Sequence, residues 1–313
     1  LKEAIAGLYT DVVTPEMGLC GHGGTGANAI VCYTLCEPGD NIVSILPNYQ
    51  QYYSIPESLG NEVRIYTCDE KSDYKIDFTE LAKLVDSHTK MINLASPNNP
   101  TGYALDQSEM EQLAKLARSV GAYVVCDEIY RGLSDDYMPS ICDVYEKGIC
   151  TSSTSKVFSS AGTRVGWIVT RDLSIKDAMM NMRSYHSICE GPINELIAAI
   201  ILENKEVFYK RNTAIVKAAQ DVLKEWLKGQ PHFKPAVESK SSTAFLYYDF
   251  DIPAADFAQE LYDKKSTLVC HGACFEQEHC FRIGFGFGDL AYFKAGLDQI
   301  GEFVKELETE GRI

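Results

Sequence analysis

One lysine of this sequence, Lys156, stands in a run of small hydroxyl residues, TSSTSKVFSSAGTR, with Arg164 eight positions further on. Neither an apolar face nor a nearby acidic residue gives this amine a structural partner in the sequence. A lysine that forms an imine with a carbonyl cofactor needs such a setting, in which hydroxyl and guanidinium groups can also hold a phosphate. A serine-rich surface loop with an incidental lysine would have the same composition, so this stretch alone leaves both interpretations open.

A carboxylate, Asp127, directly follows the apolar run Tyr123 to Cys126, at the end of a strand that we expect to be buried. A bare buried carboxylate is costly, so Asp127 must have a partner. The partner is either a basic side chain or the cationic nitrogen of a ring. At ~4 Å and an effective dielectric constant of about 20, such a pair contributes ~4 kcal/mol, about three pK units. That energy would keep a weakly basic pyridine protonated at neutral pH.

Four further side chains have both a chemical and a structural interpretation. Tyr130 can present its hydroxyl to the same ligand as Asp127, or it can serve in packing. Asn99, in the turn SPNNPTG, can donate to a ring oxygen or only shape the turn. Tyr49 is either an ordinary aromatic residue or a flat surface on which a ring stacks. Arg282, in the apolar strand HCFRIGF, either binds a substrate carboxylate or forms a salt bridge with an acid in the core.

A glycine cluster, GLCGHGGTGAN, runs directly into an apolar helical stretch from Ala27 to Leu35. Backbone N–H groups at such a helix start can point at an anion, and the helix dipole adds about half a positive charge. The cluster is not a Walker loop, because no Gly-Lys-Ser/Thr follows, and it lacks the full GxGxxG spacing of a dinucleotide site. A flexible turn before a core helix is an equally good interpretation.

The composition argues against several classes of function. The formal net charge of −15 over 313 residues does not suit a nucleic-acid or anionic-membrane surface, which needs a basic footprint. The 11 cysteines and the histidines show no ligand-like spacing, so no metal site is predicted. Scattered, unpaired cysteines are typical of the reducing cytoplasm. No stretch approaches 18 consecutive apolar residues, so no membrane span is predicted.

The order of the predicted elements indicates an α/β fold. Strands are predicted at 42–46, 63–66, 91–95, 122–126, near 149 and at 166–169, and helices at 1–9, 27–35, 50–59, 77–85 and 107–120. This alternation favours a large domain with a mostly parallel sheet flanked by helices. In such a sheet, ligands bind beyond the carboxyl ends of the strands. Tyr49, Asn99, Asp127 and the segment 153–156 each follow a predicted strand, so we expect them to converge at one edge.

A smaller α+β unit follows the large one. Beyond Glu195 a long helical pattern, interrupted near Asn204, leads to a linker marked by Pro231 and Pro235. Strands are then predicted at 244–250, 268–274 and 281–287, and helices at 257–264 and 292–307. We therefore predict a large cofactor-binding domain, 1–205, and a small C-terminal domain, 206–313.

Considered together, the motifs SPNNPTG, CDEIY, SSTSK with an arginine eight residues after its lysine, and FRIGF resemble the class I/II aminotransferase family. This family belongs to the fold-type I pyridoxal-phosphate enzymes. The order and spacing agree over essentially the whole chain, and the set is much more specific than any one of its motifs. The resemblance implies a pyridoxal-phosphate-dependent aminotransferase, which moves an amino group between an amino acid and a 2-oxo acid.

The resemblance also implies roles for the matching residues around the cofactor ring. Lys156 would form the imine with the cofactor and then act as base in the 1,3-proton shift. Asp127 would pair with the pyridine nitrogen. Asn99 and Tyr130 would hydrogen-bond the phenolic oxygen of the ring, and Tyr49 would stack on it. Lys156, Asp127 and Tyr130 are therefore the predicted catalytic residues.

The same resemblance assigns the two ends of the site. Gly24, Thr25, Ser153 and Arg164 would hold the cofactor phosphate, with Gly23 setting the turn. Arg282 would bind the α-carboxylate of the substrate, and Asn99 would also contact the substrate.

Two expectations concern what surrounds this chain. The family implies a homodimer with the active site at the subunit interface. Its members usually continue upstream of the helix LKEAIA, with a tyrosine that reaches the phosphate of the neighbouring subunit. Because the sequence begins at Leu1 inside that helix, we expect either that the native N-terminal segment is missing from it or that the protein is an atypical short form of the family.

Other functions remain possible on the sequence alone. With the same cofactor, the reaction could be that of a lyase or a cyclising synthase, such as β-elimination or a capreomycidine-synthase type of reaction. A non-catalytic pyridoxal-phosphate-binding module is a further alternative, which the presence of Lys156 disfavours. A nicotinamide dehydrogenase would need GxGxxG after its first strand, and none is found.

Overall fold

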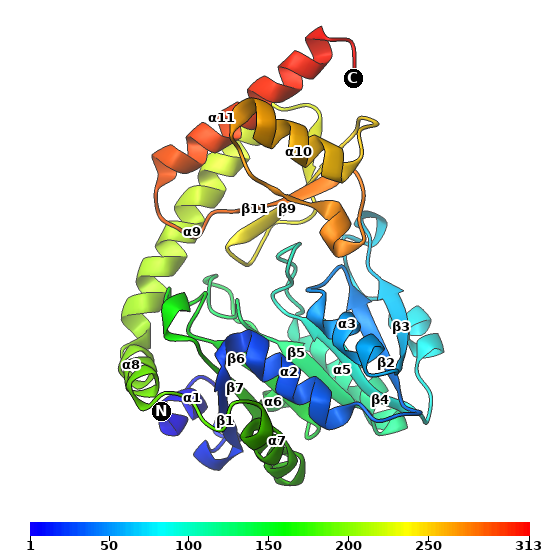
Figure 1. The fold of residues 1–313 in the computed structure, drawn as a ribbon, viewed down its shortest axis with the longest axis vertical. Helices are drawn as coiled ribbons and strands as arrows, with labels where there is room; N and C mark the ends of the chain where they lie inside the picture. The colour runs from blue at the N-terminus through cyan, green and yellow to red at the C-terminus, as the bar shows by residue number, and fades with distance from the viewer.

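The computed structural model describes residues 1–313, which form two β-sheets (Figure 1). The strands of the seven-stranded sheet are, in spatial order, β1 (Gly18–His22), β7 (Val165–Thr170), β6 (Gly148–Ser153), β5 (Tyr123–Asp127), β4 (Thr89–Ala95), β2 (Asn41–Leu46) and β3 (Glu62–Thr67). Strands β3, β2, β4, β5 and β6 are parallel, whereas β7 is antiparallel to β6 and β1. The predicted mostly parallel sheet is therefore confirmed.

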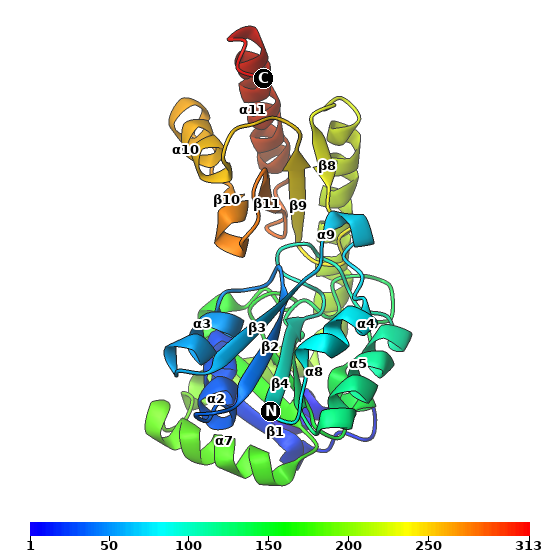
Figure 2. The same ribbon diagram turned by 90° about the vertical axis from the view of Figure 1, so that its right-hand side faces the viewer.

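Helices cover both faces of this sheet (Figure 2). They are α1 (Lys2–Ala6), α2 (Gly23–Leu35), α3 (Gln51–Ser58), α4 (Phe78–Leu81), α5 (Gln107–Val120), α6 (Ile141–Val144), α7 (Leu173–His186) and α8 (Pro192–Glu203). Alternation along β5 shows the two faces: Val125 belongs to the apolar cluster under α2 and α7, and Val124 and Cys126 to the cluster under α5. No helix combines the length and the apolar composition needed to cross a membrane.

Helix α5 has clear signals at both of its ends. Asp106 caps its start by accepting a hydrogen bond from the backbone N–H of Glu109 at 2.8 Å, and the Glu109 carboxylate accepts one from the backbone N–H of Asp106 at 3.0 Å. Gly121 ends the helix at φ +79°, the left-handed conformation that glycine adopts without strain. The chain thus turns back at once into β5, whose carboxyl end carries Asp127.

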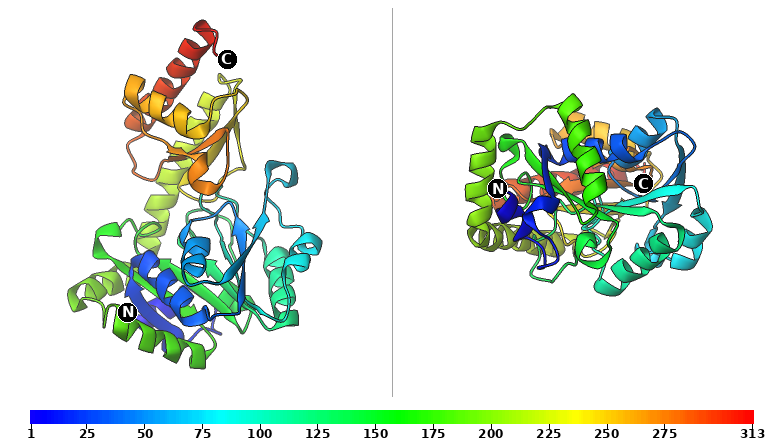
Figure 3. Two further views of the ribbon diagram at one scale, coloured as in Figure 1. Left: turned by 45° about the vertical axis from the view of Figure 1, so that its right-hand side comes forward. Right: turned by 90° about the horizontal axis from the view of Figure 1, so that it is seen from below.

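The second sheet is antiparallel and stands above the carboxyl ends of the first (Figures 1 and 3). Its order is β10 (Cys270–His271), β11 (Cys280–Gly284), β9 (Thr243–Tyr248) and β8 (Phe233–Pro235). Helices α10 (Ala254–Lys265) and α11 (Leu290–Thr309) pack against it, and stacked aromatic rings such as Phe257 and Phe281 fill its core. Helix α9 (Lys205–Leu227) runs from the large sheet to the small one.

Some local predictions were wrong. Strand β1 was not predicted, and its residues GLCGH were assigned to the glycine cluster. Glycine is rare in strands, so two glycines in five residues hide the strand pattern. The stretch 268–274 is a strand only at Cys270–His271 and then forms a 3₁₀ turn, Gly272–Phe275. The expected linker near Pro235 contains the edge strand β8, where a proline is tolerated. The break at Asn204 between α8 and α9 was correctly predicted.

Candidate active site

The carboxyl ends of the parallel strands lie next to one another. In the pairing register Ala95 is opposite Asp127, and Asp127 is opposite Thr151. The turns after β4, β5 and β6 therefore meet at one edge, below the small sheet. A cavity of about 1290 Å³ opens there and is lined by residues of both sheets. Most of the predicted site residues line it: Gly24, Thr25, Tyr49, Asn99, Asp127, Tyr130, Lys156 and Arg282.

The three remaining predicted residues, Gly23, Ser153 and Arg164, lie beside Gly24. The Ser153 hydroxyl oxygen is 3.8 Å from the position that a Cβ on Gly24 would occupy. A Cβ on Gly23 would collide with the guanidinium of Arg164. Serine, arginine and the glycine turn thus surround one small region at the N-terminus of α2.

Glycine is needed in this turn because the backbone of β7 lies very close to it. Gly23 has φ +68°, and a Cβ on Gly166 in β7 would overlap the backbone of Gly23 and Gly24. Strand β7 therefore holds the start of α2 against the ends of the neighbouring strands. The first N–H groups of α2 have no acceptor within the helix, so this corner can bind an anion. The helix begins at Gly23, four residues earlier than predicted.

Asp127 is 7% exposed and has only neutral hydrogen-bond donors. Its Oδ2 accepts from the Tyr52 hydroxyl at 2.8 Å and from Asn28 Nδ2 at 3.3 Å, and its Oδ1 accepts from the N–H of Ile129 at 2.9 Å. Burial raises the pKa of this carboxyl, while these donors and the charge of Lys156 lower it. No lysine or arginine forms an ion pair with it, so the expected alternative of a basic side chain is wrong, and the pairing with a ring nitrogen stays a prediction.

Lys156 extends into the cavity from the turn after β6, and its amine has no hydrogen-bond or ion-pair partner in the chain. The pKa of this amine is lowered, first by the protein atoms that displace water around it and then by Arg282, against the opposing effect of Asp127. A lowered pKa increases the fraction of neutral amine, the form that attacks a carbonyl.

Arg282 lies on β11, in the upper wall of the cavity. Its Nη1 donates to Asn99 Oδ1 at 2.8 Å, and its guanidinium carbon is 5.3 Å from the ring centre of Phe275. Arg282 forms no salt bridge with an acid, so the alternative interpretation, a salt bridge in the core, is wrong. A guanidinium held by an amide and an aromatic face keeps donors free for a carboxylate.

The two tyrosines of the site differ in exposure. Tyr130 is 4% exposed, and burial raises the pKa of its hydroxyl to about 12, with Asp127 adding to this rise and Arg282 opposing it. It is therefore a neutral donor at physiological pH. Tyr49 is 36% exposed and lies at the wall of the cavity with its ring accessible.

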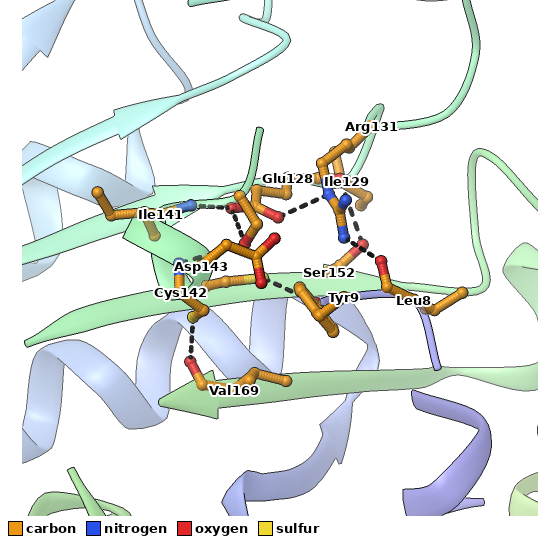
Figure 4. Close-up of polar contacts among 12 residues, drawn as sticks. Leu8, Tyr9, Glu128, Ile129, Arg131, Ile141, Cys142, Asp143, Ser152 and Val169 are labelled. Atoms are coloured by element: carbon orange, nitrogen blue, oxygen red, sulfur yellow. Dashed lines mark hydrogen bonds and ion pairs between the residues drawn. The ribbon is translucent and has the colours of Figure 1, made fainter. Parts of the chain in front are cut away.

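A buried ion pair shapes the turn that follows Asp127 (Figure 4). Glu128 Oε2 is 2.8 Å from Arg131 Nε, and Glu128 Oε1 accepts from the Ser140 hydroxyl at 2.8 Å and the N–H of Ile141 at 3.0 Å. Arg131 also donates to the carbonyl of Leu8 at 2.9 Å. This pair connects the N-terminal segment to the turn that carries Asp127 and Tyr130.

Two residues at the site were not predicted from the sequence, Asn28 and Tyr52. Asn28 is a buried polar residue within the apolar helix α2, and its Oδ1 has no hydrogen-bond partner. An asparagine among apolar residues was the available signal. Tyr52 lies three residues after Tyr49 but is 1% exposed, and nothing in the run PNYQQYYS distinguishes it from its neighbours.

Comparison with known proteins identifies the family. The model of the family "Aminotransferase class I and II" matches residues 1–300. The chain belongs to the class I and II aminotransferases. A solved pyridoxal-phosphate-dependent aminotransferase from Streptococcus suis superposes with a TM-score of 0.94 at 35% identity, over 97% of this chain and 81% of that one.

Curated aminotransferases are more distant in sequence. Nicotianamine aminotransferase 1 of Oryza sativa subsp. japonica is 27% identical over 90% of this chain and 60% of its own length. Aspartate aminotransferase of Thermotoga maritima is 24% identical over 97% of this chain and 80% of its own length. The aminotransferase chain described here thus spans between 60% and 80% of these two relatives. The predicted family, fold type, enzyme class and pyridoxal-phosphate cofactor are confirmed at the level of the family.

Proposed function

We propose that this chain transfers an amino group between an amino acid and a 2-oxo acid, with pyridoxal phosphate held in the cavity between the two sheets. One observation carries the proposal. The unpartnered amine of Lys156 shares a cavity with Asp127, a buried carboxylate that lacks a basic partner. A cofactor with an aldehyde and a basic ring nitrogen is complementary to both groups.

The residues of the cavity fit that cofactor. The N–H groups of Gly24 and Thr25, the hydroxyl of Ser153 and the guanidinium of Arg164 would bind its phosphate. The place of this anion is supported by the close packing of Gly166 against the glycine turn. The unsatisfied Oδ1 of Asn28 and the neutral donors around Asp127 indicate that this pocket is polar and built for a further group.

When bound, pyridoxal phosphate supplies an aldehyde that links to amines and a ring that withdraws electrons from the α-carbon of the substrate. Asp127 would keep a proton on the ring nitrogen. Asn99 and Tyr130 would orient the ring through its phenolic oxygen, and Tyr49 would cover one ring face. Lys156 would anchor the aldehyde between turnovers and, once displaced, carry the proton from the α-carbon of the substrate.

Substrate binding would depend on Arg282. Its guanidinium is fixed by Asn99 and Phe275 at the upper wall and would bind the α-carboxylate in a bidentate manner. Arg282 and Lys156 line the same cavity, so a substrate held by its α-carboxylate would lie in the space that Lys156 enters.

We further propose the organisation predicted from the sequence: a large domain 1–205, a small domain 206–313, a homodimer and a cytoplasmic location. Two separate sheets and the break between α8 and α9 at Asn204 support the division. Exposed apolar residues around α8, including Ile188, Ile193 and Leu196, support an interface with a second copy. Eleven unpaired cysteines support a reducing compartment.

Replacing Lys156 with alanine tests the proposal. The wild-type protein should retain cofactor on one peptide, the one containing Lys156, after borohydride reduction and mass spectrometry, and Lys156→Ala should retain none and show no turnover. Lys115→Ala, on the exposed side of α5, is the matched control and should behave as wild type. Full turnover by Lys156→Ala would refute the assignment.

The reaction type is tested with purified holoenzyme, single amino acids and 2-oxoglutarate. Transamination yields glutamate, and the cofactor changes to its amine form when the 2-oxo acid is left out. Pyruvate and ammonia released without 2-oxoglutarate would instead identify a β-eliminating lyase.

A further inference from the structure

The Asp127 carboxylate is not held by a cation of the chain but by a tyrosine from another element. Tyr52, on α3, donates its hydroxyl to Asp127 Oδ2 at 2.8 Å. Asn28, on α2, reaches the same oxygen only at 3.3 Å. A hydrogen bond to an ionised acceptor is roughly twice as strong as a neutral one and fixes the direction of the lone pairs. Tyr52 is thus the main side-chain contact of the carboxylate.

Tyr52 is itself held in place. Its ring is 1% exposed, and its backbone carbonyl accepts from Asn93 Nδ2 at 2.8 Å. Asn93 Oδ1 in turn accepts from the Ser44 hydroxyl at 2.7 Å. Asn93 and Ser44 are fully buried, on β4 and β2. These bonds tie the backbone of Tyr52 to β4 and β2. The buried ring then holds the hydroxyl against Asp127, and turning it away would leave a buried hydroxyl unpaired.

We infer that Tyr52 is a positioning residue, which holds the Asp127 carboxylate ionised and directed at the ring nitrogen of the cofactor. The inference rests on the proposed function, because it concerns how that site binds pyridoxal phosphate. Tyr52 does not touch the reacting atoms and acts through Asp127.

No cationic side chain forms an ion pair with Asp127, so the neutral hydroxyl of Tyr52 holds the carboxylate. Burial raises the pKa of the Tyr52 hydroxyl well above its ordinary value, and the charge of Asp127 adds to this, so the group remains a donor at all working pH values. The titratable groups that face Asp127 from the packed elements are Lys156 of the β6–β7 connection and Tyr130 of its own turn. Cys126 is buried and protonated, and Arg282 acts on Lys156 and Tyr130 from the upper wall.

The test compares two cofactors on the cofactor-free protein: pyridoxal phosphate and its 1-deaza analogue, in which carbon replaces the ring nitrogen. Tyr52→Phe removes only the hydroxyl. It should weaken the binding of pyridoxal phosphate about tenfold, as expected for one pK unit at Asp127, and leave the binding of the deaza analogue unchanged. Both affinities are measured by fluorescence titration.

Tyr145→Phe is the matched control. Tyr145 is also 1% exposed and donates to the carbonyl of Ala122 at 2.7 Å, at the opposite end of β5. The Tyr145→Phe variant loses a buried hydrogen bond of the same kind. Its affinities for pyridoxal phosphate and for the deaza analogue should equal those of wild type. In an Asp127→Asn background, Tyr52→Phe should cause no further change in the ratio of the two affinities.

The outcomes separate the inference from the proposed function. Equal weakening of both cofactors by Tyr52→Phe would show a merely structural role and overturn the inference, as would no effect on either. Failure of the wild-type protein to bind pyridoxal phosphate would refute the proposed function itself. A loss confined to the cofactor with a ring nitrogen supports the positioning role.

Discussion

Asp127 and Glu128 are neighbours at the end of β5, and both are buried carboxylates, 7% and 1% exposed. Burial raises the pKa of both. Their partners differ. Glu128 is paired with Arg131 and accepts from Ser140 and a backbone N–H, whereas Asp127 has only neutral donors and faces a cavity. A buried acid with its own cation serves the fold, and a buried acid without one is available to a ligand.

Removal of the paired charge should have the largest effect on stability. Glu128→Gln leaves the guanidinium of Arg131 buried without its counter-charge, at a cost of about 3–5 kcal/mol. Urea denaturation should show this loss, with the turnover number at a temperature well below the transition changed less than tenfold. Glu111→Gln, on the exposed side of α5, is the control and should be as stable as wild type. Unchanged stability of Glu128→Gln would contradict the role assigned to the pair.

Removal of the unpaired charge should affect activity instead. Asp127→Asn keeps the shape of the side chain but cannot hold a proton on a ring nitrogen. We expect kcat/KM to fall roughly 10²–10³-fold, the range found when one preorganised electrostatic group is lost. The free energy of unfolding of the cofactor-free variant should be no lower than that of wild type. Steady-state kinetics and urea denaturation of the same sample check both statements, and wild-type kinetics would sink them.

A smaller effect is expected from Ser140→Ala. The Ser140 hydroxyl donates to Glu128 Oε1 at 2.8 Å, but that carboxylate keeps Arg131 and the N–H of Ile141. Loss of one hydrogen bond to a charged group costs about 1.5 kcal/mol. Denaturation measures this loss, which should be smaller in the Glu128→Gln background, because an amide oxygen is a weaker acceptor than a carboxylate. The contact of the Ser140 hydroxyl with the N–H of Cys142 is lost in both backgrounds.

The smallest expected effect is on the pH dependence of the stability of the folded protein. Between its ordinary pKa of 3.8 and its raised folded pKa, Asp127 binds more protons in the folded than in the unfolded protein. Stability therefore decreases as pH rises through that interval. Cofactor-free wild type should lose stability relative to Asp127→Asn as pH rises above 4, and pyridoxal phosphate should reduce the difference. The midpoints of thermal unfolding of both proteins, measured over this pH range, test the expectation. Identical pH profiles for wild type and Asp127→Asn would contradict it.

Much of the site could be predicted because its residues follow strands that have clear local signals. Apolar runs bounded by turn residues mark β4, β5 and β6, and each ends with polar groups in the next few positions. Parallel strands place their carboxyl ends at the same edge of the sheet, so Asn99, Asp127 and Lys156 could be assigned to one edge without a structure. They meet there because β4, β5 and β6 are neighbours.

The sequence by itself determined the family motifs, the parallel sheet and the residues at the strand ends, because each depends on short runs of the chain. Only the tertiary structure decided the donors around Asp127 and the distant segment that contacts the Glu128–Arg131 pair. Tyr52 and Asn28 come from helices far from Asp127 in sequence, and Arg131 meets Leu8 across 123 residues. Contacts of this kind depend on how α2, α3 and the N-terminal segment pack on the sheet, which has no local pattern in the sequence.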